Sequence, residues 1–335
     1  ATDFKLQPKG YLTSFLDDEL KFIVQDGRFN VIDTIAAQNG YTADLHELRY
    51  DEDMHAFFLC YDPQLVDMSL VVPGGQPDAV VTGLIVQELD ENKDLVFQWR
   101  SWDHYEITDA SNWVDLTDNS IDYVHGNSIE IVNDNVMMIS SRNMNEITSI
   151  DRNTGDILWR LNGEKNMFEF IPPADSFCMQ HSIRLMPDSS NISIFDNGNC
   201  WVPAYSSAVE YVLDEENFTA TLVERLRSEP DIYGPFMGNA QRLFNGHTVN
   251  GWGKGVPSVT EFDTSGNIVL EFSFPQLNYR AFKFDWHHQV FHADVEAIDF
   301  GTIDYHVPVS TCLLYTSDAA DECCGVVGGG GGGGC

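Results

Sequence analysis

The feature that most constrains the fold is a repeat of short β-rich runs separated by turns. Four segments share one outline: two runs, a turn or loop, a third run that ends in an aspartate, and a fourth run. Runs rich in Val, Ile and Thr between Asn, Asp and Gly turns predict strands. The clearest copy reads NSIEIV (127–132), VMMISS (136–141), NEITSID (145–151) and DILWRL (156–161). Four short antiparallel strands of this kind make one blade of a β-propeller.

The hairpin between the third and fourth runs aligns best among the copies. The aspartate that closes the third run is Asp90, Asp151, Asp214 and Asp263. A four-strand unit that recurs at propeller-blade spacing favours a propeller over the alternative, an all-β sandwich with several Greek keys. No long helical periodicity is present, so the predicted fold class is all-β. Trp99, Trp159 and Trp252 are expected to pack between blades.

The repeat also predicts the organisation of the chain. Residues 1–44 are expected to form a partial first blade, because FIVQDGRFNVIDTI (22–35) resembles an outer hairpin without inner strands upstream. Residues 45–278 are expected to form four complete blades, the first with a long insertion between its second and third strands. Residues 279–311 are expected to be a truncated blade or C-terminal segment.

The segment 312–335 has a different character. It reads CLLYTSDAADE and then CCGVVGGGGGGGC. The first part resembles the translation of a sequencing-library adapter, and the glycine run resembles the translation of failed base calls. The segment is therefore predicted not to be native, the alternative being a genuine Gly-rich tail.

Charge and composition exclude some function classes. The formal net charge is −34, so the chain should repel phosphate backbones and anionic membrane surfaces, and a nucleic-acid partner is not expected. No stretch approaches the roughly 20 apolar residues of a membrane span. Outside the tail, Cys60, Cys178 and Cys200 are scattered, form no CxxC pair and predict no disulfide framework, so they do not settle the compartment.

Polar residues recur where the first run of each copy begins. Aligning DLHELR, MQHSIRL and MGNAQRL makes His46, His181 and Asn239 equivalent; in the remaining copy Asn127 takes this place, with His125 two residues earlier. Innermost strands line a propeller's channel, so these side chains are predicted to converge at one channel mouth. The plain alternative is that each His caps a loop or binds channel water. Three His could also bind zinc, but HExxH and a cysteine cluster are lacking, and neither a metal nor another cofactor is expected.

Several of these segments, in order, resemble the arylsulfotransferase (aryl-sulfate sulfotransferase, ASST-type) family. They are DYVHGNSIEI, MISSRNMNEITSIDRNTGDILWRLNG, QHSIRL, ISIFDNG, the run around AVEYVLD, and GNAQRLFNGHT, and they cover roughly residues 40–285. The resemblance implies a six-bladed propeller, usually exported to the periplasm or the extracellular space. It implies sulfuryl transfer from an aryl sulfate to a phenol, without a nucleotide donor, through a transient sulfohistidine. A quinoprotein propeller, suggested by the W-R repeats, is the weaker alternative.

Carried onto this sequence, the resemblance assigns catalytic roles to His125, His181 and Arg142. His46, Asn127 and Asn239 complete the predicted site as substrate-binding residues. Fixed Arg, imidazole and amide donors suit the charge on the three oxygens of a sulfuryl group in transfer. The chain departs from the family pattern at Ser207, where an Arg is expected, and at Gly238-Asn239, where a fourth-blade His is expected; His247 is instead expected to be a turn residue. An inactive binding propeller is therefore the alternative function.

Overall fold

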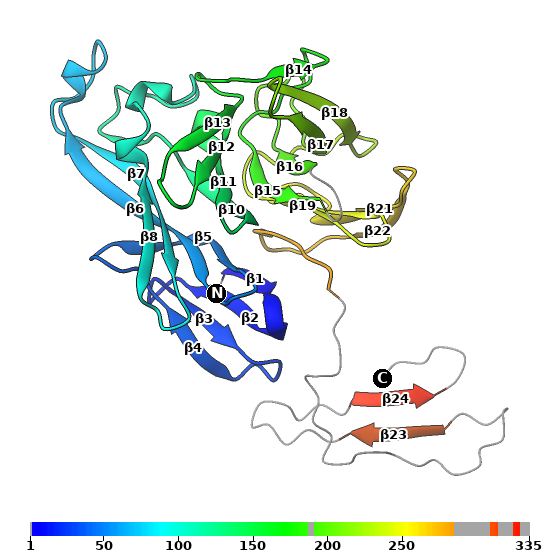
Figure 1. Ribbon diagram of the computed structural model, residues 1–335. Coiled ribbons are helices and arrows are strands. Elements are labelled where there is room, and N and C mark those ends of the chain that lie inside the picture. The colour runs from blue at the N-terminus through cyan, green and yellow to red at the C-terminus, as the bar shows by residue number, and fades with distance from the viewer. Residues whose placement is uncertain (1, 187–190, 285–308, 314–323, 329–335) are drawn as a thin grey trace. The chain divides into compact units, whose positions relative to one another are not determined.

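The computed structural model describes residues 2–186, 191–284, 309–313 and 324–328. The chain divides into two compact units, Ala1–His287 and His288–Cys335. In the first unit, five small antiparallel sheets are arranged in a ring as the blades of a β-propeller (Figure 1). The all-β propeller prediction is confirmed, and the sandwich alternative is wrong.

Each blade is built from strands that follow one another in sequence. Blade 1 contains β1 (Thr2–Leu6), β2 (Leu12–Leu16), β3 (Lys21–Gln25) and β4 (Val31–Ile35). Blade 2 contains β5 (Thr42–Tyr50), β6 (Ala56–Val66), β7 (Ala79–Leu89) and β8 (Leu95–Arg100), with β9 (Ser120–Asp122) parallel to β7. Blade 3 contains β10 (Gly126–Asn133), β11 (Val136–Ser141), β12 (Glu146–Asp151) and β13 (Ile157–Leu161).

The remaining blades follow the same plan. Blade 4 contains β15 (His181–Leu185), β16 (Ile192–Asp196), β17 (Ser207–Asp214) and β18 (Thr219–Leu226), with β14 (Glu169–Ile171) parallel to β18. Blade 5 contains β19 (Asn239–Arg242), β20 (Thr248–Gly251), β21 (Val259–Phe262) and β22 (Ile268–Phe272). Short 3₁₀ turns connect strands: η1 (Pro8–Gly10), η2 (Met68–Leu70), η3 (Ser101–Asp103), η4 (Ile107–Asp109) and η5 (Arg142–Met144). Among the described residues, no helix has the length and apolar character needed to cross a bilayer.

Blade 1 corrects the expectation of a lone outer hairpin. Strands β1 and β2 supply the inner half of the sheet, and β2 pairs with β3 from Leu12↔Gln25 to Leu16↔Lys21. The sequence signal is weak here because β1 is only five residues long and contains Asp3 and Lys5. Both side chains are buried: Lys5 pairs with Asp3 and with Glu47 of blade 2, and Asp3 also pairs with Arg280. This strand therefore lacks an apolar inner face.

The repeated aspartates have a local role that explains their recurrence. Each accepts backbone N–H bonds from the turn that follows it, as when Asp151 Oδ1 accepts from Asn153 N at 2.7 Å and Thr154 N at 3.1 Å. Asp90, Asp214 and Asp263 form the same kind of Asx turn. Asp26 does so in blade 1, with Arg28 N and Asn30 N as donors. The aspartate therefore marks the outer hairpin of all five blades.

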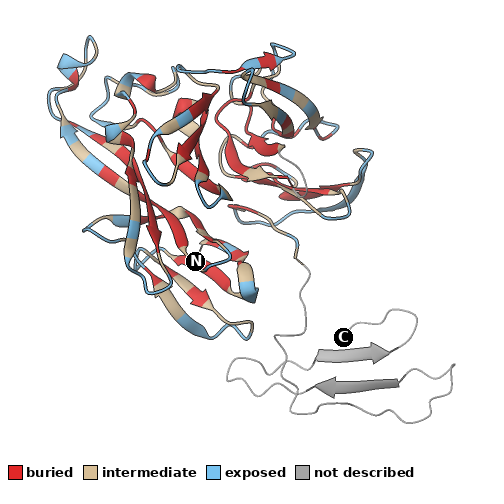
Figure 2. Cartoon of the chain, viewed as in Figure 1, coloured by how far each residue is buried: buried red, intermediate tan, exposed pale blue. Residues whose placement is uncertain are grey.

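The insertion expected in blade 2 is largely an extension of two strands. Strands β6 and β7 pair from Ala56↔Leu89 to Val66↔Ala79, and η2 lies in the connection between them. The core lies between neighbouring blades, where Trp99, Trp159 and Trp252 are buried in separate interblade clusters, as expected. Figure 2 shows buried positions concentrated along the strands and exposed positions in the turns.

The innermost strands run parallel to one another around the channel. Asn127 Oδ1 accepts from Ser182 N at 3.1 Å and Ser128 Oγ accepts from Ile183 N at 2.9 Å, so β10 and β15 advance in step. Residues 279–284 continue the arrangement beside β19. There, Asn239 and Gln241 each exchange two hydrogen bonds with the backbone of Ala281 and Lys283, respectively. This segment occupies the place of a further innermost strand.

In the second unit, β23 (Val309–Leu313) pairs antiparallel with β24 (Cys324–Gly328). Most of residues 279–311, and most of the segment 312–335 that is predicted not to be native, lie outside the described residues.

Candidate functional site

Three predicted histidines lie on or directly before neighbouring innermost strands. His46 is in β5, His125 directly precedes β10, and His181 opens β15. The ring centroids of His46 and His125 are 4.9 Å apart in an edge-to-face arrangement. The charges of His125 and His46 both act on the pKa of His181. The structure therefore brings the three side chains together at one end of the innermost strands.

His46 and His125 each bind a carboxylate through Nδ1. The distance from His46 Nδ1 to Asp44 Oδ2 is 2.5 Å, and that from His125 Nδ1 to Asp122 Oδ2 is 2.7 Å. The carboxylates fix the ring orientations and leave Nε2 as the second nitrogen of each imidazole. Sequence reasoning missed both aspartates, although each precedes its histidine by two or three residues.

The backbone of His125 is held in an uncommon conformation. Its φ is 49°, in the left-handed region that non-glycine residues rarely adopt. Asp122 Oδ1 accepts from His125 N at 2.9 Å, and His125 O accepts from Arg142 N at 3.0 Å. These bonds offset the conformational cost and place the ring against His46. Retained strain of this kind is common at functional sites.

His181 is almost completely buried and has an amide partner instead of a carboxylate. Its Nδ1 lies 2.7 Å from Asn197 Oδ1. Asn197 Nδ2 donates to the carbonyls of Gly234 and Met237, which fixes Oδ1 as the acceptor facing the ring. Nδ1 of His181 must therefore carry the proton, and Nε2 carries the lone pair. Asn197 belongs to the FDNG motif, so a sequence signal for it existed, but its role did not follow from the motif.

Electrostatics keep the His181 ring neutral. Burial lowers the pKa of His181 well below its usual value, and the nearby charges of Arg142, His125 and His46 lower it further.

We expect the ring ¹H and ¹⁵N NMR signals of His181 to stay constant from about pH 8 down to well below ~6.5, the ordinary pKa of a histidine, since the folded state holds the neutral form. A titration midpoint near that ordinary value would contradict this environment.

Arg142 is placed differently from the other buried arginines. Nη1 donates to Asn143 Oδ1 at 2.9 Å and Nη2 to the carbonyl of Pro235 at 3.2 Å. Its buried Nε has no hydrogen-bond partner among the described residues, which is also true of Arg100, Arg152, Arg225 and Arg280. Within residues 2–186 and 191–284, every other arginine that is not exposed forms an ion pair with a carboxylate. These are Arg49, Arg100, Arg152, Arg160, Arg184, Arg225, Arg242 and Arg280.

Arg142 is thus a partly buried cation that forms no ion pair with a carboxylate among the described residues, in a chain of net charge −34. Burial lowers its pKa, which Asp122 and Tyr233 partly oppose. Such a group can be compensated by an anion that binds beside it.

The two predicted asparagines do not serve as free substrate donors. Asn127 is fully buried; its Nδ2 donates to Gln180 O at 2.9 Å, and its Oδ1 accepts from the backbone of Ser182. Asn239 bonds both backbone groups of Ala281 at 2.7 Å. Both amides are used to join neighbouring innermost strands. The sequence does not predict this structural role, and the substrate-binding role of the two asparagines stays a prediction.

The chain departs from the family pattern at Ser207 in blade 4 and at Gly238-Asn239 where blade 5 begins, and both departures have physical explanations. Ser207 Oγ accepts from Arg225 Nη1 at 2.9 Å, so a guanidinium stands beside it, although Asp196 already neutralises that group. Gly238 has a φ of +96°, and a Cβ there would lie 2.4 Å from the Phe195 ring, which excludes a histidine. His247 lies in the turn between β19 and β20 and binds Glu261, as expected of a turn residue.

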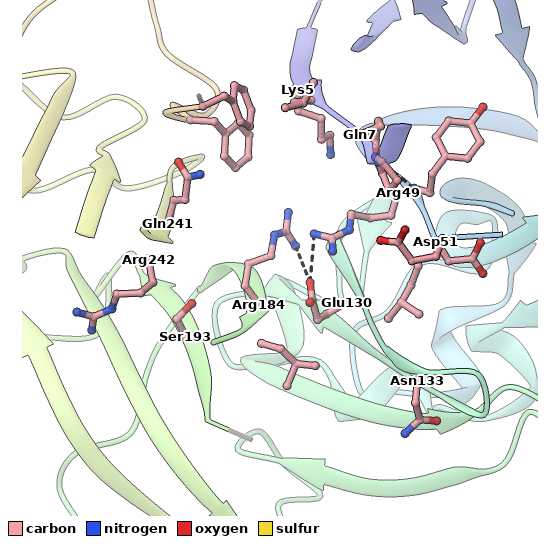
Figure 3. Close-up of a pocket in the computed structure, with 18 of the residues that line it drawn as sticks. Lys5, Gln7, Arg49, Asp51, Glu130, Asn133, Arg184, Ser193, Gln241 and Arg242 are labelled. Carbon is pink, nitrogen blue, oxygen red and sulfur yellow. Dashed lines mark hydrogen bonds and ion pairs between the residues drawn. The ribbon is translucent and has the colours of Figure 1, made fainter. Parts of the chain in front are cut away.

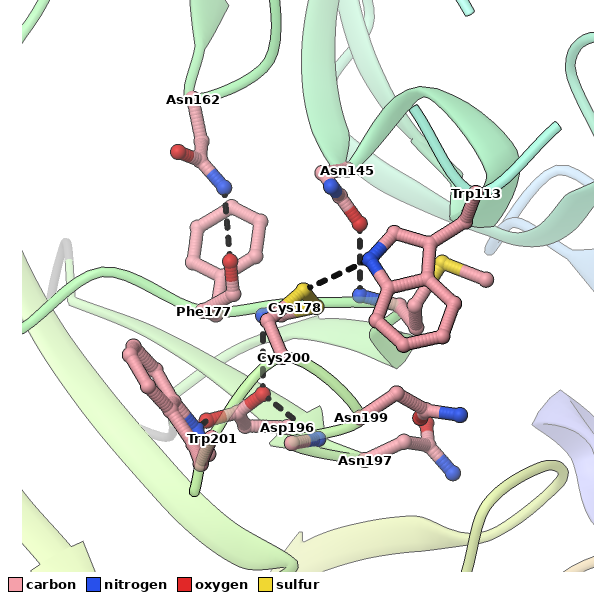
Figure 4. The surroundings of a disulfide bond; sticks show 12 residues. Trp113, Asn145, Asn162, Phe177, Cys178, Asp196, Asn197, Asn199, Cys200 and Trp201 are labelled. Atoms are coloured by element: carbon pink, nitrogen blue, oxygen red, sulfur yellow. Dashed lines mark hydrogen bonds between the residues drawn. A yellow bond between two sulfur atoms is a disulfide. The ribbon is translucent and has the colours of Figure 1, made fainter. Parts of the chain in front are cut away.

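A disulfide joins the two loops that hold His181 and its partner. Cys178 and Cys200 are bonded, with Cys178 three residues before His181 and Cys200 three residues after Asn197 (Figure 4). Asp196 Oδ1 accepts from Cys178 N at 2.9 Å and Gly198 N at 3.0 Å, which closes the same loops. No sequence signal indicated this pairing, because the two cysteines are 22 residues apart and in no recognisable pattern.

Reduction of this disulfide is expected to lower the free energy of unfolding by about 3 kcal/mol, since it opens a loop that the bond keeps closed in the unfolded chain. Chemical denaturation with and without dithiothreitol measures the change. The double variant C178S/C200S is the control and should not respond to reductant. Equal stability of the wild type under both conditions would contradict the expectation.

A cavity of about 580 Å³ lies at the opposite ends of the innermost strands. Figure 3 shows Lys5, Arg49 and Arg184 among its lining residues, with Arg49 and Arg184 both directed at Glu130. Each of the cations that line it has a carboxylate partner. At this end of the channel the cations are therefore paired with carboxylates, whereas Arg142 at the other end forms no such ion pair among the described residues. Among the described residues, no cluster of three or more His, Cys, Asp or Glu side chains is arranged to hold a metal ion.

The fold and the arrangement of the three histidines and Arg142 define a β-propeller with a candidate site at one channel mouth. A model of the arylsulfotransferase (ASST) family matches residues 14–275, and the chain belongs to this family. No curated protein shows significant similarity to the sequence.

Among the solved structures named here, the first supports the fold alone. A Bacteroides caccae protein of unknown function aligns at 13% identity and a TM-score of 0.50, over 82% of this chain and 83% of that chain. A catalytically inactive variant of virginiamycin B lyase from Staphylococcus aureus, with quinupristin, aligns at 10% identity and a TM-score of 0.42, over 81% of this chain and 83% of that chain.

Proposed function

We propose that this protein transfers a sulfuryl group from an aryl sulfate ester to a phenolic acceptor, without a nucleotide donor, through a sulfohistidine at His181. The observation that carries the proposal is the Arg142 guanidinium, which forms no ion pair with a carboxylate among the described residues, near the neutral His181 imidazole with its fixed tautomer. The guanidinium can bind the sulfate oxygens, and the imidazole offers its Nε2 lone pair as the nucleophile. Family membership supports arylsulfotransferase-like activity in general.

His181 and His125 take different roles in the reaction, His181 as the nucleophile and His125 as the general acid and base. In the first step Nε2 of His181 attacks sulfur, an N–S bond forms, and the S–O bond to the phenol oxygen breaks. The leaving phenolate takes a proton from Nε2 of His125, whose Nδ1 is held by Asp122. In the second step the acceptor phenol returns a proton to His125 while its oxygen attacks sulfur, and His181 is released unchanged.

Asn197 supports His181 in both steps. The Nδ1–H of His181 stays directed at Asn197 Oδ1, so the sulfated ring need not lose a proton. Arg142 and Asn197 are anchored on the same segment: Arg142 donates to the carbonyl of Pro235, and Asn197 to those of Gly234 and Met237. His46, against His125, completes the site as a positioning residue.

The second candidate function is a binding propeller that does not turn over. It is favoured by Ser207 in place of the expected arginine and by Gly238-Asn239 in place of the expected histidine. In this candidate function an anion binds at Arg142, but no histidine acts as a nucleophile.

Incubation with 4-nitrophenyl sulfate, with and without a phenol acceptor, separates these functions. The proposal expects 4-nitrophenol release that requires the acceptor, together with formation of the sulfated acceptor. Release without acceptor would indicate a sulfatase, and binding without release would indicate the binding propeller. Either result would contradict the proposed transfer.

We also propose that the protein works in an oxidising compartment outside the cytoplasm. The Cys178–Cys200 disulfide supports this location, because such bonds persist mainly in exported proteins. Quantification of free thiols in protein purified from its native source tests it. One free thiol outside residues 312–335, at Cys60, is expected; free thiols at Cys178 and Cys200 as well would contradict the proposal.

A further inference from the structure

An exposed tryptophan stands next to the candidate site without a role in the core. Trp113 is 55% exposed, in the connection between β8 and β9. Its neighbours Ala110, Val114 and Leu116 pack against the core of blades 2 and 3 and anchor the loop. Exposing a large indole on an anchored loop leaves apolar area in water that a ligand ring can cover.

The indole is also fixed in orientation. Trp113 Nε1 donates to Cys200 Sγ at 3.1 Å, and Figure 4 shows the ring beside the disulfide. The backbone N of Ser111 donates to Asn143 O at 2.8 Å, which ties this loop to the residue after Arg142. A ring held in this way loses little conformational freedom when a ligand binds.

A short chain of contacts connects Trp113 to Arg142. Cys200 follows Asn199, and Asn199 Nδ2 donates to the carbonyl of Pro235 at 3.2 Å. Arg142 Nη2 donates to that same carbonyl, also at 3.2 Å. Two polar atoms along this chain, Asn199 Oδ1 and Arg142 Nε, are buried without a hydrogen-bond partner among the described residues. The contacts thus place the exposed tryptophan on loops that share the Pro235 carbonyl with Arg142.

We propose that Trp113 forms the aryl subsite of the proposed transfer reaction, binding the aromatic ring of the sulfated phenol whose sulfate lies at Arg142. The inference rests on the proposed function. In a ping-pong reaction the first phenol leaves before the second enters, so one aryl subsite serves both donor and acceptor. The disulfide holds this subsite and His181 in one unit, because Cys178 precedes His181 and Cys200 accepts from Trp113.

The test compares an aryl with an alkyl sulfate ester. Calorimetric titration with 4-nitrophenyl sulfate and with methyl sulfate gives the affinity for each in the wild type, Trp113→Leu and Trp113→Phe. Trp113→Leu is expected to weaken 4-nitrophenyl sulfate binding by about 10-fold and to leave methyl sulfate binding unchanged, while Trp113→Phe retains most of the aryl affinity. Phe244→Leu is the matched control, since Phe244 is 95% exposed in the turn between β19 and β20.

The outcomes distinguish this inference from the function it rests on. If both esters bind and Trp113→Leu weakens them equally or not at all, the aryl subsite is wrong while the sulfate site stands. If the wild type binds neither ester, the sulfate site and the aryl subsite both fail. A Phe244→Leu variant with the same selective loss would also contradict the assignment.

Discussion

Arg142→Lys is expected to lower kcat/KM for sulfuryl transfer by roughly 10- to 1000-fold, equivalent to about 1.4–4 kcal/mol of transition-state stabilisation. A guanidinium offers a planar fork of donors to the sulfate oxygens, and an ammonium does not reproduce that geometry. The contacts of Arg142 support this expectation, because its guanidinium forms no ion pair with a carboxylate among the described residues. Steady-state kinetics with 4-nitrophenyl sulfate and a phenol acceptor measure the change.

The control for this substitution is Arg227→Lys, since Arg227 is exposed and pairs with Asp231. It should leave kcat/KM unchanged, and both variants should unfold at nearly the wild-type temperature. Equal kcat/KM for Arg142→Lys and wild type would remove Arg142 from the site. If the wild type does not turn over, calorimetry of Arg142→Ala with 4-nitrophenyl sulfate tests whether the anion site exists.

Glu47→Gln is expected to lower the free energy of unfolding by about 3–5 kcal/mol, because it leaves buried cations without their shared partner. The carboxylate of Glu47 is fully buried and pairs with Lys5, with Arg184 Nη2 at 2.7 Å and with Arg280 Nη1 at 3.3 Å. Burial by itself would raise the pKa of Glu47, but these three cations hold it well below its usual value. Urea denaturation followed by fluorescence gives the free energy.

Glu91→Gln is the matched control for Glu47→Gln. Its carboxylate is 62% exposed and lies 3.8 Å from His55 Nε2, so its removal should change stability by less than about 0.5 kcal/mol. A Glu47→Gln variant as stable as Glu91→Gln would show that the cations in the channel do not depend on Glu47. Since the folded-state pKa of Glu47 is lowered, its contribution should be present above pH ~4.5 and decline as the pH falls further.

The propeller could be predicted because its information is local and repeated. The closing aspartates Asp90, Asp151, Asp214 and Asp263 each form an Asx turn that needs only the next few residues. Blade 1 was only half predicted, because β1 buries Asp3 and Lys5 in ion pairs with residues far away in the sequence. Charge compensation across blades leaves no local pattern to detect.

The sequence predicts that the three histidines lie together, but it does not identify the residues that bind their side chains. Repeat alignment placed His181 correctly at the start of β15, whereas His46 lies within β5. The aligned position in β10 and β19 holds Asn127 and Asn239, which join strands. Whether a residue at this position belongs to the candidate site or joins two strands depends on contacts with residues far away in the sequence. Asn197, the Cys178–Cys200 bond and Trp113 lie on loops that meet only in the folded chain.

The most direct test of the proposed mechanism is to trap the sulfated enzyme. The protein is incubated with 4-nitrophenyl sulfate without an acceptor, digested, and its peptides are examined by mass spectrometry with fragmentation. We predict a single added SO₃ group on the His181 ring, lost when a phenol acceptor is added and absent in His181→Gln. Acceptor-dependent turnover with no modified His181, or with the SO₃ group on His125, would contradict the assignment of His181 as the nucleophile.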